Sequence, residues 1–277
     1  MESNFSEAQI AAMYDRDFEY LLELWDGQPV QHAGYFDENS YDYRQATNRT
    51  NDVLASKAGL CSGSRVLDIG CGTGDLALHI ARSFSCVVEA IDLSKRHLDH
   101  ASQRIPLNGS LRVGFRQASA TNLPYADGSF SHVMSQDALY HVIDKPRSHN
   151  EISRVLAPGG VLAITDFLEP AKDISARLRP LIYEGMLRNT GYSFRGYVQA
   201  LEAAGFEILL ADDISKYFRR SYIHLAKTAR DRAAGSTLRQ ERRAFLRYAQ
   251  ACLEIQAGIE RQEFGWGMFV ARKRALL

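Results

Sequence analysis

The segment 66–81, VLDIGCGTGDLALHIA, constrains the fold of this chain more than any other. A short apolar run that contains Asp68 leads into Gly70, Gly72 and Gly74, and an amphipathic run follows. Glycines at such positions allow a tight turn and a close approach of the backbone to a ligand, so the pattern indicates a strand, a turn and a helix. The turn holds no lysine, and its G-x-G-x-G spacing differs from G-x-G-x-x-G. It therefore matches neither a phosphate loop nor the usual dinucleotide fingerprint.

From residue 65 onwards, short apolar segments alternate with amphipathic ones. Strands are expected at residues 65–70, 87–93, 112–118, 130–136, 160–169, 205–214 and 263–274. Helices are expected between the first five of them, at residues 75–84, 94–105 and 145–157. Such alternation favours parallel strands with helices on both faces of the sheet. The sequence therefore predicts a doubly wound α/β domain, in which ligands bind beyond the carboxyl ends of the strands.

The two ends of the chain depart from this alternation. Residues 1–58 are rich in aromatic and acidic side chains and are expected to form helices around a loop, as an N-terminal lid. Residues 216–262 separate the last two expected strands and read as helical, because structureless loops of that length are uncommon. We expect a single domain in which an α/β core, residues 59–215 and 263–277, carries a helical cap insertion at 216–262 over the active site.

Composition narrows the class of protein. The 33 Lys and Arg residues equal the 33 Asp and Glu residues, so no excess charge favours nucleic acid or an anionic membrane as a partner. No run of about eighteen apolar residues predicts a membrane span, and residues 1–9 do not resemble a secretory signal. The four cysteines are scattered without a C-x-x-C pair, which favours a reduced compartment over a disulfide framework or a zinc site. We therefore expect a cytoplasmic protein without a metal site, and the sequence leaves a homo-oligomer open.

Three carboxylates surround the glycine turn. Asp68 precedes it, Asp75 follows it, and Asp92 ends the second expected strand, 24 residues beyond Asp68. A phosphate ligand would favour a lysine or a helix N-terminus free of carboxylates, whereas this pattern suits a ligand with an ammonium group or a net positive charge. An acidic residue in the position of Asp92 can also accept hydrogen bonds from ribose hydroxyls. The alternative interpretation is a tight strand-to-helix turn that binds no ligand.

Four motifs together resemble the class I S-adenosylmethionine-dependent methyltransferases. They are VLDIGCGTGDLALHIA, EAIDLS, ATNLPYADGSFSHVMSQDALYHV and ISRVLAPGGVLAITD, and they cover residues 65–166. The resemblance implies a seven-stranded, Rossmann-like methyltransferase sheet whose last strand is antiparallel and lies between the fifth and the sixth. It also implies S-adenosyl-L-methionine as the cofactor and S-adenosyl-L-homocysteine as its product. The cofactor is a nucleoside with an ammonium group and a sulfonium charge, so it suits the three carboxylates.

The resemblance also implies where the cofactor binds. The expected contacts lie in the glycine turn and at the ends of the second, third and fourth strands: Asp68, Gly70, Cys71, Gly72, Gly74, Asp92, Leu93, Ser119, Ala120 and Gln136. One position departs from the family pattern, because Ser119 stands where an acidic residue often accepts the adenine amino proton. A serine hydroxyl can still accept that hydrogen bond, so this departure weakens one contact without removing the site.

Within the class, LWDGQPVQHAGYF, SQDALYH and WGMFVARK resemble sarcosine/dimethylglycine N-methyltransferases and related small-molecule enzymes. The same scaffold serves many acceptors, so N-, O- and C-methylation stay open. We favour the tailoring of a secondary metabolite, because a helical cap and aromatic-rich ends suit an apolar, ring-bearing acceptor. The alternatives are amino-acid N-methylation of the glycine-betaine type, a cofactor-binding scaffold or cyclase that transfers no methyl group, and, less favoured, a nicotinamide dehydrogenase.

His141, which follows the fourth strand, is the expected base or acceptor-orienting residue. Its alternative role is to pack a helix face against the loop. The other residues expected near the acceptor come from the lid, from the segment after the fourth strand and from the cap: Tyr14, His32, Tyr35, Gln136, Asp137, Tyr217, Arg219 and Tyr222. Aromatic faces among them can contact a cation, and an arginine can bind an anionic acceptor. For Arg219 and Arg220 a solvated helix face is the alternative, and Tyr20 is read as the apolar side of a helix.

Overall fold

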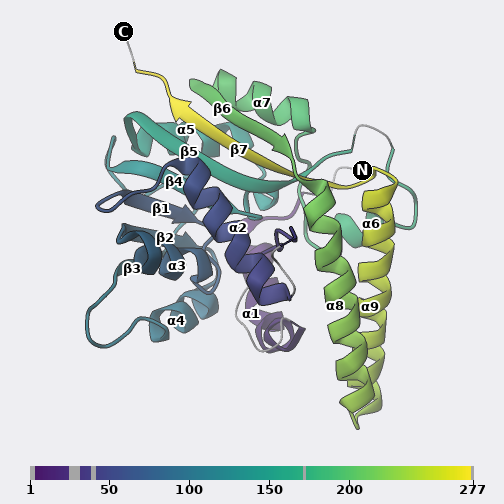
Figure 1. Cartoon of the computed structure of the whole chain (residues 1–277). Helices are drawn as coiled ribbons and strands as arrows, with labels where there is room; N and C mark the ends of the chain where they lie inside the picture. The colour runs from purple at the N-terminus through teal and green to yellow at the C-terminus, as the bar shows by residue number, and fades with distance from the viewer. Residues whose placement is uncertain (1–3, 25–31, 39–41, 171–172, 276–277) are drawn as a thin grey trace.

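The computed structural model describes residues 4–24, 32–38, 42–170 and 173–275, and a central sheet with helices on both faces dominates it (Figure 1). Within these residues, seven strands form one sheet in the order β3-β2-β1-β4-β5-β7-β6. The strands are β1 (Arg65–Ile69), β2 (Val87–Asp92), β3 (Arg112–Gln117), β4 (Phe130–Gln136), β5 (Leu156–Leu168), β6 (Phe206–Asp213) and β7 (Gly265–Lys273). The doubly wound α/β fold predicted from the sequence is confirmed.

The direction of the strands also confirms the expected topology. Strands β1 to β5 pair in parallel, whereas β7 runs antiparallel to both β5 and β6, between which it lies. The strand order reverses at β1, which pairs with β2 on one side and with β4 on the other. In open α/β sheets a ligand binds at such a switch point, beyond the carboxyl ends of the strands. The fold therefore places a binding crevice at the ends of β1, β2 and β4.

Helices connect and cover the strands. They are α1 (Glu7–Leu24), α2 (Tyr43–Ala58), α3 (Asp75–Phe84), α4 (Lys95–Gln103), α5 (Lys145–Val155), α6 (Arg179–Ile182), α7 (Phe194–Ala203), α8 (Ser215–Gly235) and α9 (Arg239–Glu260), with the 3₁₀ turn η1 (Leu139–His141). Ser94 caps α4 as its sequence position indicates, because its Oγ accepts a hydrogen bond from the His97 amide at 3.1 Å. Two apolar clusters fill the space between helices and sheet. Val66 belongs to one cluster and Leu67 to the other, since successive strand residues point to opposite faces.

One element boundary differs from the expected one. The fifth strand begins at Leu156 instead of residue 160, and α5 ends at Val155. Leu156 is fully buried and pairs with Phe130 of β4, so the Pro158–Gly159–Gly160 sequence lies inside the strand, next to a register shift in its pairing with β4. Burial of Leu156 thus extends the strand through residues that locally favour a turn.

The lid and cap regions are helical, as expected. Helices α8 and α9 occupy the 216–262 insertion and run side by side away from the sheet (Figure 1). The Tyr20 ring of α1 stacks on Phe245 of α9 with 5.5 Å between ring centroids, which fits its interpretation as an apolar helix contact. That the insertion caps the active site stays a prediction. The loop expected near Trp25 lies largely in residues 25–31, outside the described residues.

No helix among the described residues is long and apolar enough to cross a membrane. The same residues contain no group of three or more His, Cys, Asp and Glu side chains placed to hold a metal ion. The four cysteine side chains are free thiols.

Candidate active site

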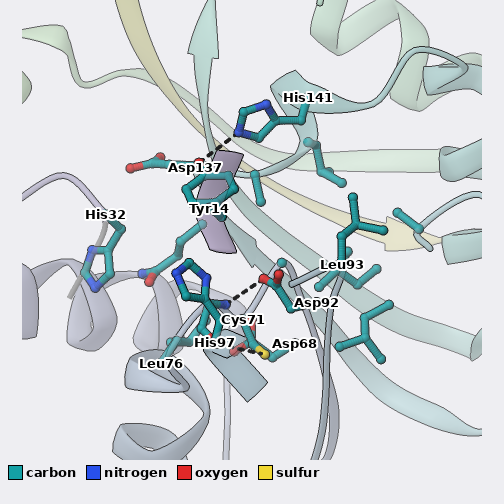
Figure 2. Close-up of a pocket in the computed structure, with 18 of the residues that line it drawn as sticks. Tyr14, His32, Asp68, Cys71, Leu76, Asp92, Leu93, His97, Asp137 and His141 are labelled. Atoms are coloured by element: carbon teal, nitrogen blue, oxygen red, sulfur yellow. Dashed lines mark hydrogen bonds between the residues drawn. The ribbon is translucent and has the colours of Figure 1, made fainter. Parts of the chain in front are cut away.

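A cavity opens at the carboxyl ends of β1, β2 and β4, where the strand order reverses. Eight of the expected cofactor residues line it: Asp68, Gly70, Cys71, Gly72, Asp92, Leu93, Ala120 and Gln136. Tyr14, His32, Asp137 and His141 line the same cavity from the lid side and from the segment after β4 (Figure 2). The structure thus brings the glycine turn and the predicted base to one site.

The glycine turn needs its glycines for two different reasons. Gly70 has φ +72°, and a Cβ on it would lie 2.3 Å from the Cβ of Ala138, so only glycine fits between the turn and the segment after β4. Gly74 lies outside the cavity lining; a Cβ there would lie 2.7 Å from the Phe115 ring. Gly70 therefore lets the backbone approach the cavity, whereas Gly74 lets the start of α3 pack against β3.

Asp92 holds the turn and presents its carboxylate to the cavity. Its Oδ2 accepts a hydrogen bond from the Gly72 amide at 2.8 Å, and its Oδ1 accepts one from the Ser94 amide at 2.8 Å. Figure 2 shows the Asp92 carboxylate beside Leu93 and close to His97. A carboxylate oxygen can accept more than one hydrogen bond, so Asp92 retains capacity for hydroxyl donors in the cavity.

Two buried polar groups of the lining have no partner among the described residues. Asp68 is 1% exposed and its Oδ2 accepts no hydrogen bond, and neither amide atom of Gln136 is paired. Burial, together with the charge of Asp92, raises the pKa of Asp68 to about 7. Buried groups of this kind are normally satisfied, so these two indicate a polar ligand. The ammonium and carboxylate groups of a bound amino-acid moiety fit this donor and acceptor set.

Asp75, the third carboxylate of the sequence pattern, is already compensated by the protein. His32 Nε2 lies 3.4 Å from Asp75 Oδ2, and Asn51 Nδ2 donates to the same oxygen at 3.0 Å. Arg104 Nη2 lies 3.5 Å from Asp75 Oδ1. Although burial opposes its charge, these partners lower the pKa of Asp75, and the Asp75 carboxylate raises the pKa of buried His32. The pair links the lid to the start of α3 and offers the ligand little net charge.

Tyr14 and His141 form a hydrogen-bonded pair at the opposite side of the cavity (Figure 2). The Leu187 carbonyl oxygen lies 3.0 Å from His141 Nδ1, and because a carbonyl only accepts, Nδ1 carries the proton. Nε2 then accepts from the Tyr14 hydroxyl at 2.9 Å, and Tyr14 in turn accepts from the Tyr140 hydroxyl at 3.5 Å. Burial lowers the pKa of His141 to about 4 and raises that of Tyr14 to about 12. Both side chains are therefore neutral near pH 7.

Asp137 lines the cavity, yet its oxygens already serve the protein. Its Oδ2 accepts from the Ala33 amide at 2.9 Å, and its Oδ1 accepts from Trp266 Nε1 at 2.6 Å and from the Thr165 hydroxyl at 2.9 Å. Asp137 adopts φ +51°, which is rare outside glycine and is held here by these bonds. It thus ties the lid to β5 and β7, a role that sequence spacing alone did not indicate.

The remaining residues expected at the acceptor lie outside this cavity lining. Tyr35 stacks on Tyr217 with 3.8 Å between centroids, and buried Tyr222 lies edge-on to Phe218. Arg219 pairs with Glu260 on the surface of the α8–α9 pair, which fits the solvated-face alternative. Ser119 also lies outside the lining and donates its hydroxyl to Glu7 Oε1 at 2.5 Å.

The lid contributes lining residues that the sequence did not indicate. Glu7 and Ile10, one helical turn apart on α1, join Tyr14 at the cavity, and His97 of α4 lies beside the Tyr14 ring. The three α1 residues follow helical spacing, so one face of this helix covers the site. Nothing in the local pattern told which face turns inward, because that depends on where α1 docks.

Known proteins resemble the chain in both sequence and fold. Residues 67–164 match the family model of a methyltransferase domain. The chain is 35% identical over 225 residues to 27-O-demethylrifamycin SV methyltransferase of Amycolatopsis mediterranei (strain S699), covering 79% of this chain and 81% of that protein. It is 30% identical over 210 residues to sarcosine/dimethylglycine N-methyltransferase of Halorhodospira halochloris, covering 75% and 74%. The solved structure of the [4+2]-cyclase SpnF superposes with a TM-score of 0.82 at 27% identity, covering 100% of this chain and 98% of that one.

Proposed function

The chain belongs to the class I S-adenosylmethionine-dependent methyltransferases, and on this premise we propose that it methylates a hydroxyl oxygen of a small, uncharged secondary metabolite. Its cofactor is S-adenosyl-L-methionine, and the acceptor is a small molecule. The relative that acts on 27-O-demethylrifamycin supports O-methylation, as do two fungal relatives named as O-methyltransferases.

The charge of the cavity carries the proposal of an uncharged acceptor. Among the described residues that line it, five are carboxylates and none is a lysine or an arginine: Glu7, Asp68, Asp75, Asp92 and Asp137. The cationic His32 is paired with Asp75. A carboxylate or phosphate on an acceptor is usually held by arginine or lysine donors. This lining therefore favours an uncharged acceptor over an amino acid such as sarcosine, whose carboxylate would find no cationic partner.

The residues fit the cofactor in a definite order. Asp92 is placed to accept from the ribose hydroxyls, and Asp68 and Gln136 supply the unpaired groups for the amino-acid end. When bound, S-adenosylmethionine supplies a methyl group that its sulfonium charge already activates, so the protein contributes chiefly alignment. Glu7 and Ile10 of α1 then cover the cavity and exclude water from it.

His141 is the base in this proposal. Its Nε2 carries the free lone pair of the ring, and the Leu187 carbonyl keeps that tautomer in place. An acceptor hydroxyl that replaces the Tyr14 hydroxyl at Nε2 can pass its proton to that nitrogen as the oxygen is methylated. Alternatively, the acceptor can donate to the Tyr14 oxygen while Tyr14 passes its own proton to His141. Either route leaves the transferred proton on Nε2.

Two measurements test the proposal. Calorimetry should show binding of S-adenosylmethionine and of S-adenosylhomocysteine. Mass spectrometry of hydroxyl-bearing acceptors, each paired with an analogue in which a carboxylate is added, should then show methylation of the uncharged member of the pair. Methylation of sarcosine or of the carboxylated members alone would contradict the assignment of the acceptor.

The likeness to a [4+2]-cyclase favours a second candidate, in which the cavity binds the cofactor and the chain catalyses a cyclisation without methyl transfer. The two functions differ in the mass of the product. A cyclisation leaves the mass of the substrate unchanged and consumes no S-adenosylmethionine, whereas methylation consumes one cofactor for each product molecule.

A further inference from the structure

Asn189 lies behind His141, away from the residues that line the cavity, and is almost fully buried. We propose that Asn189 is a positioning residue that couples the docking of α1 over the cofactor to the orientation of the His141 ring. The inference rests on the proposed role of His141 as the base. Nothing in the sequence pattern singled out this asparagine.

The first observation is that Asn189 spends its whole amide group on two backbone segments. Its Oδ1 accepts from the Phe5 amide at 2.6 Å, and its Nδ2 donates to the Phe5 carbonyl at 3.0 Å. The same Nδ2 donates to the carbonyl oxygen of His141. Phe5 directly precedes α1, which carries Tyr14, so one side chain joins the start of the covering helix to the main chain of the proposed base.

The second observation is that the neighbouring groups hold the same loop. His141 Nδ1 donates to the Leu187 carbonyl, and buried Lys145 donates to the carbonyls of Tyr140, Val142 and Thr190. Three successive carbonyls, at residues 140, 141 and 142, are thus each bound by a buried side chain. Leu187 adopts φ +44°, a strained conformation that such contacts can maintain. The ring orientation of His141 therefore depends on where the 187–190 segment lies.

The third observation is that α1 is also attached on the cofactor side of the cavity. Ser119 donates to Glu7 at 2.5 Å, Ser94 donates to Asp15 at 2.5 Å, and Arg96 Nη1 donates to the Asp15 carbonyl at 2.9 Å. Ser94 follows the strand that ends in Asp92, and Ser119 follows β3, so a bound cofactor borders these contacts. Docking of α1 on the cofactor then places Phe5 where Asn189 can hold it and His141 together.

Two variants and one matched control test this coupling. Asn189→Leu keeps the volume but removes every hydrogen bond of the amide, and Phe5→Pro removes one donor from the α1 side at a partly exposed position. Ser131→Ala is the control, because the Ser131 hydroxyl bridges the amide (3.0 Å) and the carbonyl (3.1 Å) of Arg65, as Asn189 bridges those of Phe5. Ser131 stands at the far end of β4 from His141.

The readouts need neither an acceptor nor turnover. With S-adenosylhomocysteine saturating, imidazole nitrogen NMR reports the tautomer of His141, and hydrogen exchange reports the docking of the 10–14 turn of α1. We expect one tautomer, with the proton on Nδ1, in the wild type and in Ser131→Ala. In Asn189→Leu and Phe5→Pro, both tautomers should be populated, and exchange in the 10–14 turn should rise by about tenfold or more.

Two results would overturn the inference. One is a single Nδ1–H tautomer in Asn189→Leu, which would mean that Asn189 does not position the ring. The other is unchanged exchange in α1 when either variant loses its contact. A failure to methylate hydroxyl acceptors would refute the proposed function without changing these readings, so the two failures are distinguishable.

Discussion

Cofactor affinity is expected to fall as the pH is lowered from 7 to 5, because the buried Asp68 carboxyl takes up a proton. Burial and the charge of Asp92 raise the pKa of Asp68 to about 7, and its Oδ2 has no partner among the described residues. An ammonium group of the ligand needs the ionised carboxylate. For a pKa near 7, the ionised fraction falls about 50-fold between pH 7 and pH 5, which is about 2.3 kcal/mol of binding free energy.

The assay is calorimetry with S-adenosylhomocysteine at pH 5, 6 and 7, in buffers with different ionisation enthalpies. Binding should release about half a proton at pH 7 and nearly one at pH 5. Asp68→Asn is the control; it should bind weakly and with an affinity that is nearly independent of pH in this range. A flat pH profile in the wild type, or an equal slope in Asp68→Asn, would refute the reasoning.

The same raised pKa has the opposite sign for the stability of the cofactor-free protein. The folded state binds a proton at Asp68 that the unfolded chain, in which this carboxyl has its ordinary pKa of 3.8, has already lost, so the free energy of unfolding falls as the pH rises through this window. Between pH 5 and pH 7 the wild type should lose about 2.3 kcal/mol relative to Asp68→Asn. Denaturant titrations of both proteins measure this difference.

Three substitutions test other parts of the site. Asp92→Ala should weaken cofactor binding by about 1–3 kcal/mol through loss of the ribose hydrogen bonds, and unchanged calorimetric affinity would remove this residue from the site. Gly70→Ala should abolish measurable binding and lower the thermal midpoint, since its Cβ would lie 2.3 Å from that of Ala138; normal affinity would contradict the close approach. His141→Ala should lower kcat by about 10² to 10⁴ and leave cofactor affinity within about threefold, whereas surviving turnover would show that alignment alone carries the reaction.

The cofactor half of the site could be predicted because it is local in sequence. The glycine turn and Asp92 sit at strand ends that the alternation of apolar segments marks, and a parallel sheet brings strand ends to one edge. The antiparallel place of β7 followed from the family resemblance and not from the pattern of its residues. For the same reason, the deeper role of Gly74 in packing against Phe115 was not separable from that of Gly70.

The acceptor half could not be predicted in the same way, because it depends on docking between distant segments. Tyr14 and His141 are 127 residues apart, and their contact requires one particular face of α1 to turn towards η1. Tyr35 and Tyr217 looked equivalent to Tyr14 in type, yet they stack on one another outside the cavity lining. Aromatic composition reports that a region can cover a site, but only tertiary packing selects the rings that do.

Central to the proposed function is the transfer of a methyl group onto a hydroxyl of an uncharged small molecule. Mass spectrometry with S-adenosylmethionine carrying a deuterated methyl group tests it most directly, on a panel of hydroxyl-bearing acceptors with wild type and His141→Ala side by side. The predicted result is transfer of the intact labelled methyl to oxygen, with one S-adenosylhomocysteine formed for each product and a much lower rate in the variant. Conversion of a substrate to an isomer of equal mass without consumption of the cofactor would contradict the claim.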